Sequence, residues 1–202
     1  MPTPHYEKMS QDLAIAKKIA YGVPANVCNT TLQELKVKSL ILLSHAIIEE
    51  YLEDLVLDTA TKCVMNYVTS SNICRGLVGL ISSGLIGRIE ESGLQKKTKK
   101  EPFENIGIFS NFAYGRFKTV VGDNNGIKVK DQMNLLLPVG VDPSTEDPAT
   151  MAALDSFGTK RGTVDHAFKI TKAHTLSEID GDIQNLLQGL VNYDQACLDS
   201  LQ

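Results

Sequence analysis

The sequence contains no tryptophan, and its four cysteines form no CxxC pair. Cys28, Cys63, Cys74 and Cys197 are scattered along the chain, whereas small secreted proteins carry closely patterned cysteines that pair as disulfides. We therefore expect reduced thiols, most of them buried as small apolar side chains.

Neither a targeting segment nor a membrane-spanning segment is expected from the sequence. The first residues lack a basic stretch followed by an apolar run, so no secretory signal is expected. The apolar stretch 77–87 is bracketed by Arg75 and Arg88, which leaves it too short to cross a bilayer. Hydrophobic residues make up 43% of the 202 and charged residues 22%, as in globular proteins. These features predict one cytoplasmic domain, residues 1–202, with no membrane contact.

Strand-like alternation and internal repeats are absent, and apolar residues recur instead at three- and four-residue steps. Two capping boxes, Thr31–Glu34 and Thr175–Glu178, predict the starts of a long early helix and of the last helix. Along the early helix the apolar stripe includes Leu40, Leu43 and Ile47, and Ile48 and Leu52 widen it. Further helices are expected over residues 6–21, 72–91, 105–121, 128–137 and 148–170. In the 72–91 helix, small residues such as Gly76 and Gly79 would let a neighbouring helix approach closely. The fold class is therefore all-α, a helical bundle with short extra helices.

The net charge of −4 conceals an uneven distribution of charge. Lysines at 96, 97, 99 and 100 are interpreted as a solvated loop. A second basic group, Lys160, Lys169 and Lys172, surrounds Arg161 near the end of the 148–170 helix. Such a local basic face can attract a phosphate backbone even on an acidic protein, so these lysines are candidate RNA contacts.

The candidate catalytic residues are Arg161 and His166, which the sequence places on one late helix. RNA can be cleaved without a metal when its own 2′-hydroxyl attacks the phosphorus. Histidine suits the two proton transfers because its pKa lies near neutrality, and the planar arginine fork suits the charged phosphorane. Two such helices around a two-fold axis would provide one acid and one base from a single motif.

This segment, Arg161-Gly-Thr-Val-Asp-His166, resembles the signature of the HEPN superfamily, in particular its RiboL-PSP-HEPN branch: an arginine, four to six residues and a histidine on a late helix. The stretch from Leu43 to Leu55 is similar to the long early helix of that branch, and the stretch from Phe103 to Gly115 is a looser third match. The resemblance implies an all-α fold of the HEPN type.

The resemblance also implies a function: metal-independent endoribonucleolytic cleavage of RNA without a cofactor, by a homodimer or larger homo-oligomer. Such activity often belongs to toxin–antitoxin or antiviral defence systems, with an antitoxin or defence protein as partner. Catalytic members usually carry a polar residue directly after the arginine, whereas this chain has Gly162. The alternative is therefore a non-catalytic HEPN-like module that binds RNA or a protein. A third interpretation is a helical interaction subunit that docks through its acidic last helix, with Asp180 and Asp182 as the docking carboxylates.

Three residues are candidate auxiliaries. Asp165 precedes the histidine and could orient its ring, and His45 and Glu49 lie one turn apart on the early helix, where they could assist the active cleft. The structural interpretation of His45 is a packed core histidine, because it aligns with Ile41 and Ile48. The sequence indicates no complete ligand set for a metal.

Overall fold

The computed structural model describes residues 1–83, 102–165 and 174–202 and, of residues 102–105 and 165, only the backbone. These parts of the chain are helical and contain no strand, so the predicted all-α class is confirmed. The bounds of the elements are α1 Pro4–Ala16, η1 Lys17–Ala20, α2 Thr31–Ser70, α3 Arg75–Ser82, α5 Pro102–Gly122, α6 Val129–Leu136, η3 Leu137–Val139, α7 Pro143–Glu146, α8 Pro148–Asp165 and α9 Leu176–Asp199.

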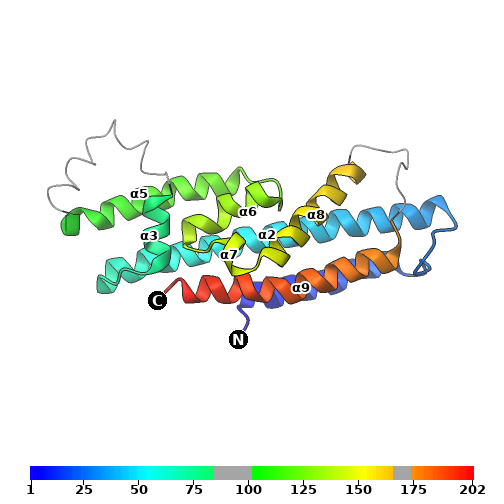
Figure 1. Ribbon diagram of the computed structural model, residues 1–202, viewed down its shortest axis with the longest axis horizontal. Helices are drawn as coiled ribbons and strands as arrows, with labels where there is room; N and C mark the ends of the chain where they lie inside the picture. Colours follow the sequence, from blue (N-terminus) through cyan, green and yellow to red (C-terminus); the bar gives the residue numbers. More distant parts are fainter. Residues whose placement is uncertain (84–101, 166–173) are drawn as a thin grey trace.

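The 40-residue helix α2 is the axis of the molecule, about 60 Å long at 1.5 Å per residue. Helices α1 and α9 run along it on one side, and α5, α6 and α8 lie on the other (Figure 1). The buried apolar residues of these helices form one continuous core. Leu40, Ile48 and Leu52 are buried in that core as predicted, but Leu43 is 43% exposed, so its expected place in the core is wrong.

The cap of α2 differs from the expected box by one residue. Thr30, in extended conformation, is the N-cap, and its side chain accepts a hydrogen bond from the backbone N–H of Gln33 at 3.3 Å. The Gln33 side chain in turn accepts from the backbone N–H of Asn29 at 2.8 Å. The two side chains that accept hydrogen bonds from the backbone N–H groups at the start of α2 are thus Thr30 and Gln33, rather than Thr31 and Glu34.

The second predicted cap is half correct. The Thr175 hydroxyl accepts from the backbone N–H of Glu178 at 3.1 Å and starts α9. The Glu178 carboxylate does not return to the N-cap, because it binds Lys160 of α8 at 2.7 Å. The start of α9 therefore holds the end of α8 in place.

The remaining helices differ from their predicted bounds. The expected helix at 6–21 divides into α1 and the 3-10 turn η1, and the helix at 72–91 begins at Arg75 and is described as far as Ser82. The expected continuation of α8 beyond Asp165 lies outside the described residues. Gly76 and Gly79 of α3 allow a close approach, as their size predicts, but the neighbour at Gly79 is the turn around Gly140 rather than a helix.

Candidate functional site

Helix α8, which carries Arg161, is fixed at its start by Asp147. The Asp147 carboxylate accepts hydrogen bonds from the backbone N–H and the hydroxyl of Thr150 and from the side-chain amide of Asn192 on α9. Burial would raise the pKa of this carboxyl, but these hydrogen bonds outweigh it and lower the pKa. The helix therefore begins at an ionised cap that also binds α9.

Near the other end of α8, Lys160 is bound to α9. Its ammonium lies 2.7 Å from the Glu178 carboxylate and 2.6 Å from that of Asp182, and its side chain is only 18% exposed. Lys160, predicted as an RNA contact, thus has two carboxylate partners within its own chain. Any contact with RNA would have to displace them.

The neighbouring Arg161 is partly buried, on a helix that packs against α2. Its positive charge acts on both His45 and Glu49 of α2. Burial is the main reason that the pKa of His45 falls to about 4, and the charge of Arg161 lowers it further. Packing of α8 on α2 therefore brings the charge of the candidate catalytic arginine within range of both auxiliary residues, although they lie more than a hundred positions earlier in the sequence.

His45 and Glu49 form the inner part of this cluster. The Nδ1 atom of His45 lies 3.5 Å from the Glu49 carboxylate, and the two side chains are 4% and 19% exposed. Since its pKa is about 4, His45 is neutral at neutral pH and cannot donate a proton as a general acid there. Burial, and next the neighbouring charge of Glu53, raise the pKa of Glu49. The Oε1 atom of Glu49 is buried and accepts no hydrogen bond among the described residues.

Two charges at the start of α6 complete the surroundings of His45. The charge of Asp131 raises its pKa and that of Lys128 lowers it. Asp131 also accepts a hydrogen bond from the backbone N–H of Lys128 at 3.1 Å and so caps α6. Neither Asp131 nor Lys128 was predicted to lie near the site. An acidic residue three positions after a helix start is a visible capping signal, but it does not indicate which helix lies opposite.

The other predicted site residues are only partly placed. Asp165 is the last residue of α8, and only its backbone is described. His166, Lys169 and Lys172 lie outside the described residues. The structure therefore brings Arg161 together with His45 and Glu49, and leaves the position of the candidate catalytic histidine as an expectation.

Gly162, the departure from the HEPN pattern, is not required by packing. A Cβ atom at this position would meet no other atom within 4 Å, and the backbone is helical. A polar side chain would fit here without rearrangement. Gly162 therefore lacks the hydrogen-bonding side chain of catalytic HEPN members, and no neighbouring segment packs so closely that a glycine is needed.

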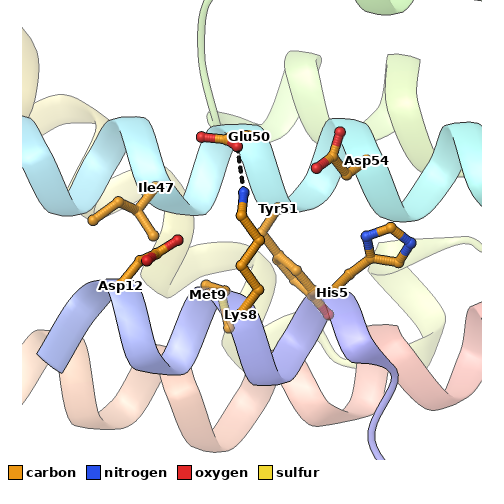
Figure 2. Close-up of a pocket in the computed structure, with 8 residues that line it drawn as sticks. All are labelled: His5, Lys8, Met9, Asp12, Ile47, Glu50, Tyr51 and Asp54. Carbon is orange, nitrogen blue, oxygen red and sulfur yellow. Dashed lines mark hydrogen bonds and ion pairs between the residues drawn. The ribbon is translucent and has the colours of Figure 1, made fainter. Parts of the chain in front are cut away.

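A separate polar pocket lies between α1 and α2, on the side of Tyr51 and Met9 (Figure 2). Figure 2 shows the ammonium of Lys8 bound to Glu50. His5 contributes a ring nitrogen 3.4 Å from Asp58. These pairs join α1 to α2, and the pocket is too small to hold more than water.

The acidic last helix has little free charge in the part that the structure describes. Asp180 pairs with Lys17 at 3.0 Å and Asp182 with Lys160 at 2.6 Å. Both carboxylates proposed for docking a partner thus connect α9 to its own neighbours.

Two further findings concern metals and membranes. Within residues 1–83, 102–165 and 174–202, no three or more histidine, cysteine, aspartate or glutamate residues are grouped as a metal site requires. In the same part of the chain, no helix combines the length and the apolar character needed to cross a bilayer.

Comparison with known proteins adds no relative. No protein-family model matches the chain, no curated protein matches it, and no solved structure matches it.

Proposed function

We propose that this chain is a metal-independent endoribonuclease of the HEPN type that acts as a homodimer. The observation that carries the proposal is the charge of Arg161, which acts on the buried His45 and the half-buried Glu49 of α2 and lies on the helix that leads to His166. A permanently charged fork then acts on a polar cluster from the same helix on which the sequence predicts the imidazole.

In the proposed reaction, His166 of one subunit takes the proton from the RNA 2′-hydroxyl while its oxygen attacks the phosphorus. His166 of the second subunit gives a proton to the 5′ oxygen as the phosphorus–oxygen bond breaks. The products are a 2′,3′-cyclic phosphate and a 5′-hydroxyl. Arg161 stabilises the extra negative charge of the phosphorane, and it acts most strongly where water is excluded.

His45 and Glu49 are positioning residues in this proposal. A neutral His45 adds no positive charge beside the guanidinium, and Glu49 offers a buried acceptor near it. Together they would hold Arg161 in one orientation, which reduces the loss of side-chain freedom on binding a phosphate.

The setting we propose is a cytoplasmic toxin or antiviral-defence effector, whose partner would be an antitoxin or another defence protein. The alternative, a non-catalytic module that binds RNA or a protein, is favoured by Gly162. Because a side chain would fit at this position, its absence is not explained by packing.

The test is cleavage of a 5′-labelled single-stranded RNA in excess EDTA. We expect cyclic-phosphate ends from the wild type and a loss of about 100-fold or more in rate for Arg161→Ala and for His166→Ala, as is typical for removing one charge-stabilising or proton-transfer group. The matched control is Arg116→Ala, since Arg116 is an exposed arginine that stacks on Phe112 in α5. It should retain the wild-type rate.

Intact RNA with the wild-type protein, or unchanged cleavage by His166→Ala, would rule out the nuclease assignment. Thermal unfolding of each variant shows whether a lost rate reflects lost folding. RNA that shifts in fluorescence anisotropy but stays uncut would support the non-catalytic alternative.

A further inference from the structure

Tyr21 is the one tyrosine or phenylalanine that lies mostly in water among the side chains that the structure describes. The residue is 86% exposed, whereas the others are buried or half-buried. An aromatic ring contributes to the core only when it is packed, so this tyrosine adds little to the stability of the bundle. The face of its ring is instead available to a ligand.

The backbone that carries the Tyr21 ring is held in a tight turn. Tyr21 has φ −54 and ψ 130, and Gly22 has φ +78. The backbone N–H of Val23 donates to the carbonyl of Ala20 at 3.0 Å, which completes a type II turn. The ammonium of Lys36 on α2 also donates to the Tyr21 carbonyl, at 2.7 Å. The backbone therefore presents the ring at a fixed position, although little of the ring is packed.

A hollow opens beside this ring, at the end of the bundle where α2 and α9 begin (Figure 1). Its volume is about 340 Å³, and pockets for small ligands begin at about 300 Å³. The residues that line it are Ala14, Lys17, Lys18, Ala20, Tyr21 and Leu176. The alanines and the leucine provide apolar surface, and both lysines are exposed. The hollow thus combines a flat ring, apolar surface and positive charge.

The lysines around the ring have donors available for an anion. The Lys17 ammonium lies 3.0 Å from the Asp180 carboxylate, and the Lys17 side chain is 47% exposed. Because an ammonium has three donors, this ion pair leaves others for a ligand. Lys18 forms no ion pair with the residues that the structure describes. Lys36 adds a third positive charge through its bond to the Tyr21 carbonyl.

We infer that Tyr21 and these lysines form a stacking subsite for single-stranded RNA. One base lies on the Tyr21 ring in the hollow, and the phosphates on either side of that base lie against Lys17 and Lys18. An exposed aromatic ring accepts the flat face of any base, and lysines attract the backbone whatever its sequence. The subsite therefore binds a strand with little preference for sequence.

The lysines favour a nucleic acid over a protein as the ligand. Interfaces between proteins are enriched in aromatic residues but depleted in lysine. Positive charge around an exposed aromatic ring is instead typical of surfaces that bind single strands. The choice of RNA as the strand rests on the proposed function, whereas the subsite itself rests on the ring, the hollow and the lysines. In the nuclease, the subsite holds the substrate and takes no part in the chemistry.

Tryptophan fluorescence tests the stacking directly, because the chain has no tryptophan of its own. Tyr21→Trp places one tryptophan at the subsite and preserves a ring on which a base can stack. A single-stranded 2′-O-methyl RNA, which has no free 2′-hydroxyl to attack the phosphorus, should quench the fluorescence of this variant. The matched control is Met65→Trp, at an exposed position in the far half of α2, whose fluorescence should not change.

Fluorescence anisotropy with the same strand, labelled at one end, measures what each side chain contributes. Tyr21→Ala should raise the dissociation constant by about 5- to 150-fold, the usual effect of losing one stacked base. Lys18→Gln should lower the slope of log Kd against log salt by about 0.7, the value for one phosphate contact on a single strand. Lys118→Gln removes the charge of an exposed lysine beside the half-buried ring of Tyr114 and should leave the slope unchanged. A melting curve for each variant confirms folding.

Two further probes identify the ligand that the subsite takes. Inorganic polyphosphate carries the charge without a base, so it should not quench the tryptophan of Tyr21→Trp. A free mononucleotide should quench it only at concentrations far above those of the strand. Equal quenching by the mononucleotide and the strand would show a pocket for a nucleotide and would contradict the strand subsite.

The subsite and the nuclease can fail separately. Unquenched fluorescence in Tyr21→Trp, or unchanged affinity in Tyr21→Ala, would overturn the subsite. Quenching by the strand together with uncut natural RNA would refute the nuclease and leave the subsite standing. With an active nuclease, Tyr21→Ala should raise KM and leave kcat unchanged, because the subsite binds the ground state and the transition state equally. A lower kcat at an unchanged KM would contradict a role in binding.

Discussion

At the scale of single residues, His45 links the candidate site to stability. Its imidazole is 3% exposed, next to Glu49 and within the field of Arg161. Burial first, and then the arginine charge, lower the pKa of His45 from 6.5 to about 4. Between these pH values His45 is protonated in the unfolded chain but stays neutral in the folded chain. The free energy of unfolding therefore falls as the pH falls through this window.

The expected size of this effect is about 2 kcal/mol between pH 7.5 and pH 5, from the two pKa values and 1.36 kcal/mol per unit. In His45→Gln the titrating group is gone, so the stability of this variant should depend less on pH by that amount. Urea unfolding at both pH values measures the difference. The raised pKa of Glu49 acts in the opposite direction but is present in both proteins.

His5→Gln is the matched control for His45→Gln, since His5 is a partly exposed histidine on α1. The pH slope of this variant measures the effect of removing a histidine that lies outside the core. Identical pH slopes for wild type and His45→Gln would show that His45 is not held in its neutral form by the fold.

At the scale of elements, the contact between α3 and the turn after η3 depends on Gly79. A Cβ atom on Gly79 would lie 2.6 Å from the backbone nitrogen of Gly140 and 3.0 Å from the carbonyl oxygen of Leu137. Both are backbone atoms and cannot rotate away. Gly140 itself has φ +78, which a residue with a side chain rarely adopts.

Gly79→Ala should therefore lower the free energy of unfolding by about 1–3 kcal/mol, the usual cost of overpacking. Gly115 on α5 offers the control, because a Cβ atom there meets nothing within 4 Å. Gly115→Ala should raise stability by up to about 1 kcal/mol through helix propensity alone. Urea titrations of both variants measure these opposite changes in the free energy of unfolding. An unchanged free energy of unfolding in Gly79→Ala would contradict the close contact between Gly79 and the turn at Gly140.

Helix positions followed from the sequence more readily than helix partners did. The spacing of Leu40, Ile48 and Leu52 predicted a buried face, because a helix repeats every 3.6 residues whatever covers it. The same spacing placed Leu43 in the core, where the structure leaves it exposed, since periodicity shows which residues are apolar but not which neighbour covers them. The small size of Gly79 likewise predicted that another segment packs closely against it, but not that this segment is the turn at Gly140.

The candidate site was predictable to a similar extent. Its residue types indicate chemistry on their own, because a permanently charged fork and an imidazole suit phosphodiester cleavage wherever they lie. Their assembly depends on α8 packing on α2, which places Arg161 near His45 and Glu49. No local pattern encodes that contact between distant segments.

At the scale of the whole molecule, Asp194 joins the N-terminal segment, α2 and α9. Its carboxylate is 1% exposed and accepts hydrogen bonds from the backbone N–H of Thr3 at 2.7 Å, from the Thr3 hydroxyl at 2.5 Å and from the Tyr51 hydroxyl at 3.2 Å. Burial first, and then the charge of Asp194, raise the pKa of Tyr51, which keeps this hydroxyl a donor. Thr3 also caps α1 by accepting from the backbone N–H of Tyr6.

Because these donors converge on one buried carboxylate, Asp194→Asn should lower the free energy of unfolding by about 2–4 kcal/mol. The amide has one acceptor oxygen, and its NH₂ group would face a donor of Thr3, which leaves buried groups unpaired. Asp199→Asn provides the control, since this residue is exposed on the same helix and its carboxylate accepts a hydrogen bond from the exposed side chain of Gln195.

Urea unfolding compares the two asparagine variants, and amide hydrogen exchange locates the loss. Exchange should accelerate first in α1, whose N-cap depends on the same threonine. If Asp194→Asn costs no more than Asp199→Asn, the carboxylate does not hold the N-terminal segment to the bundle. A matching loss in Thr3→Ala that does not add to that of Asp194→Asn would trace the stability to this one connection.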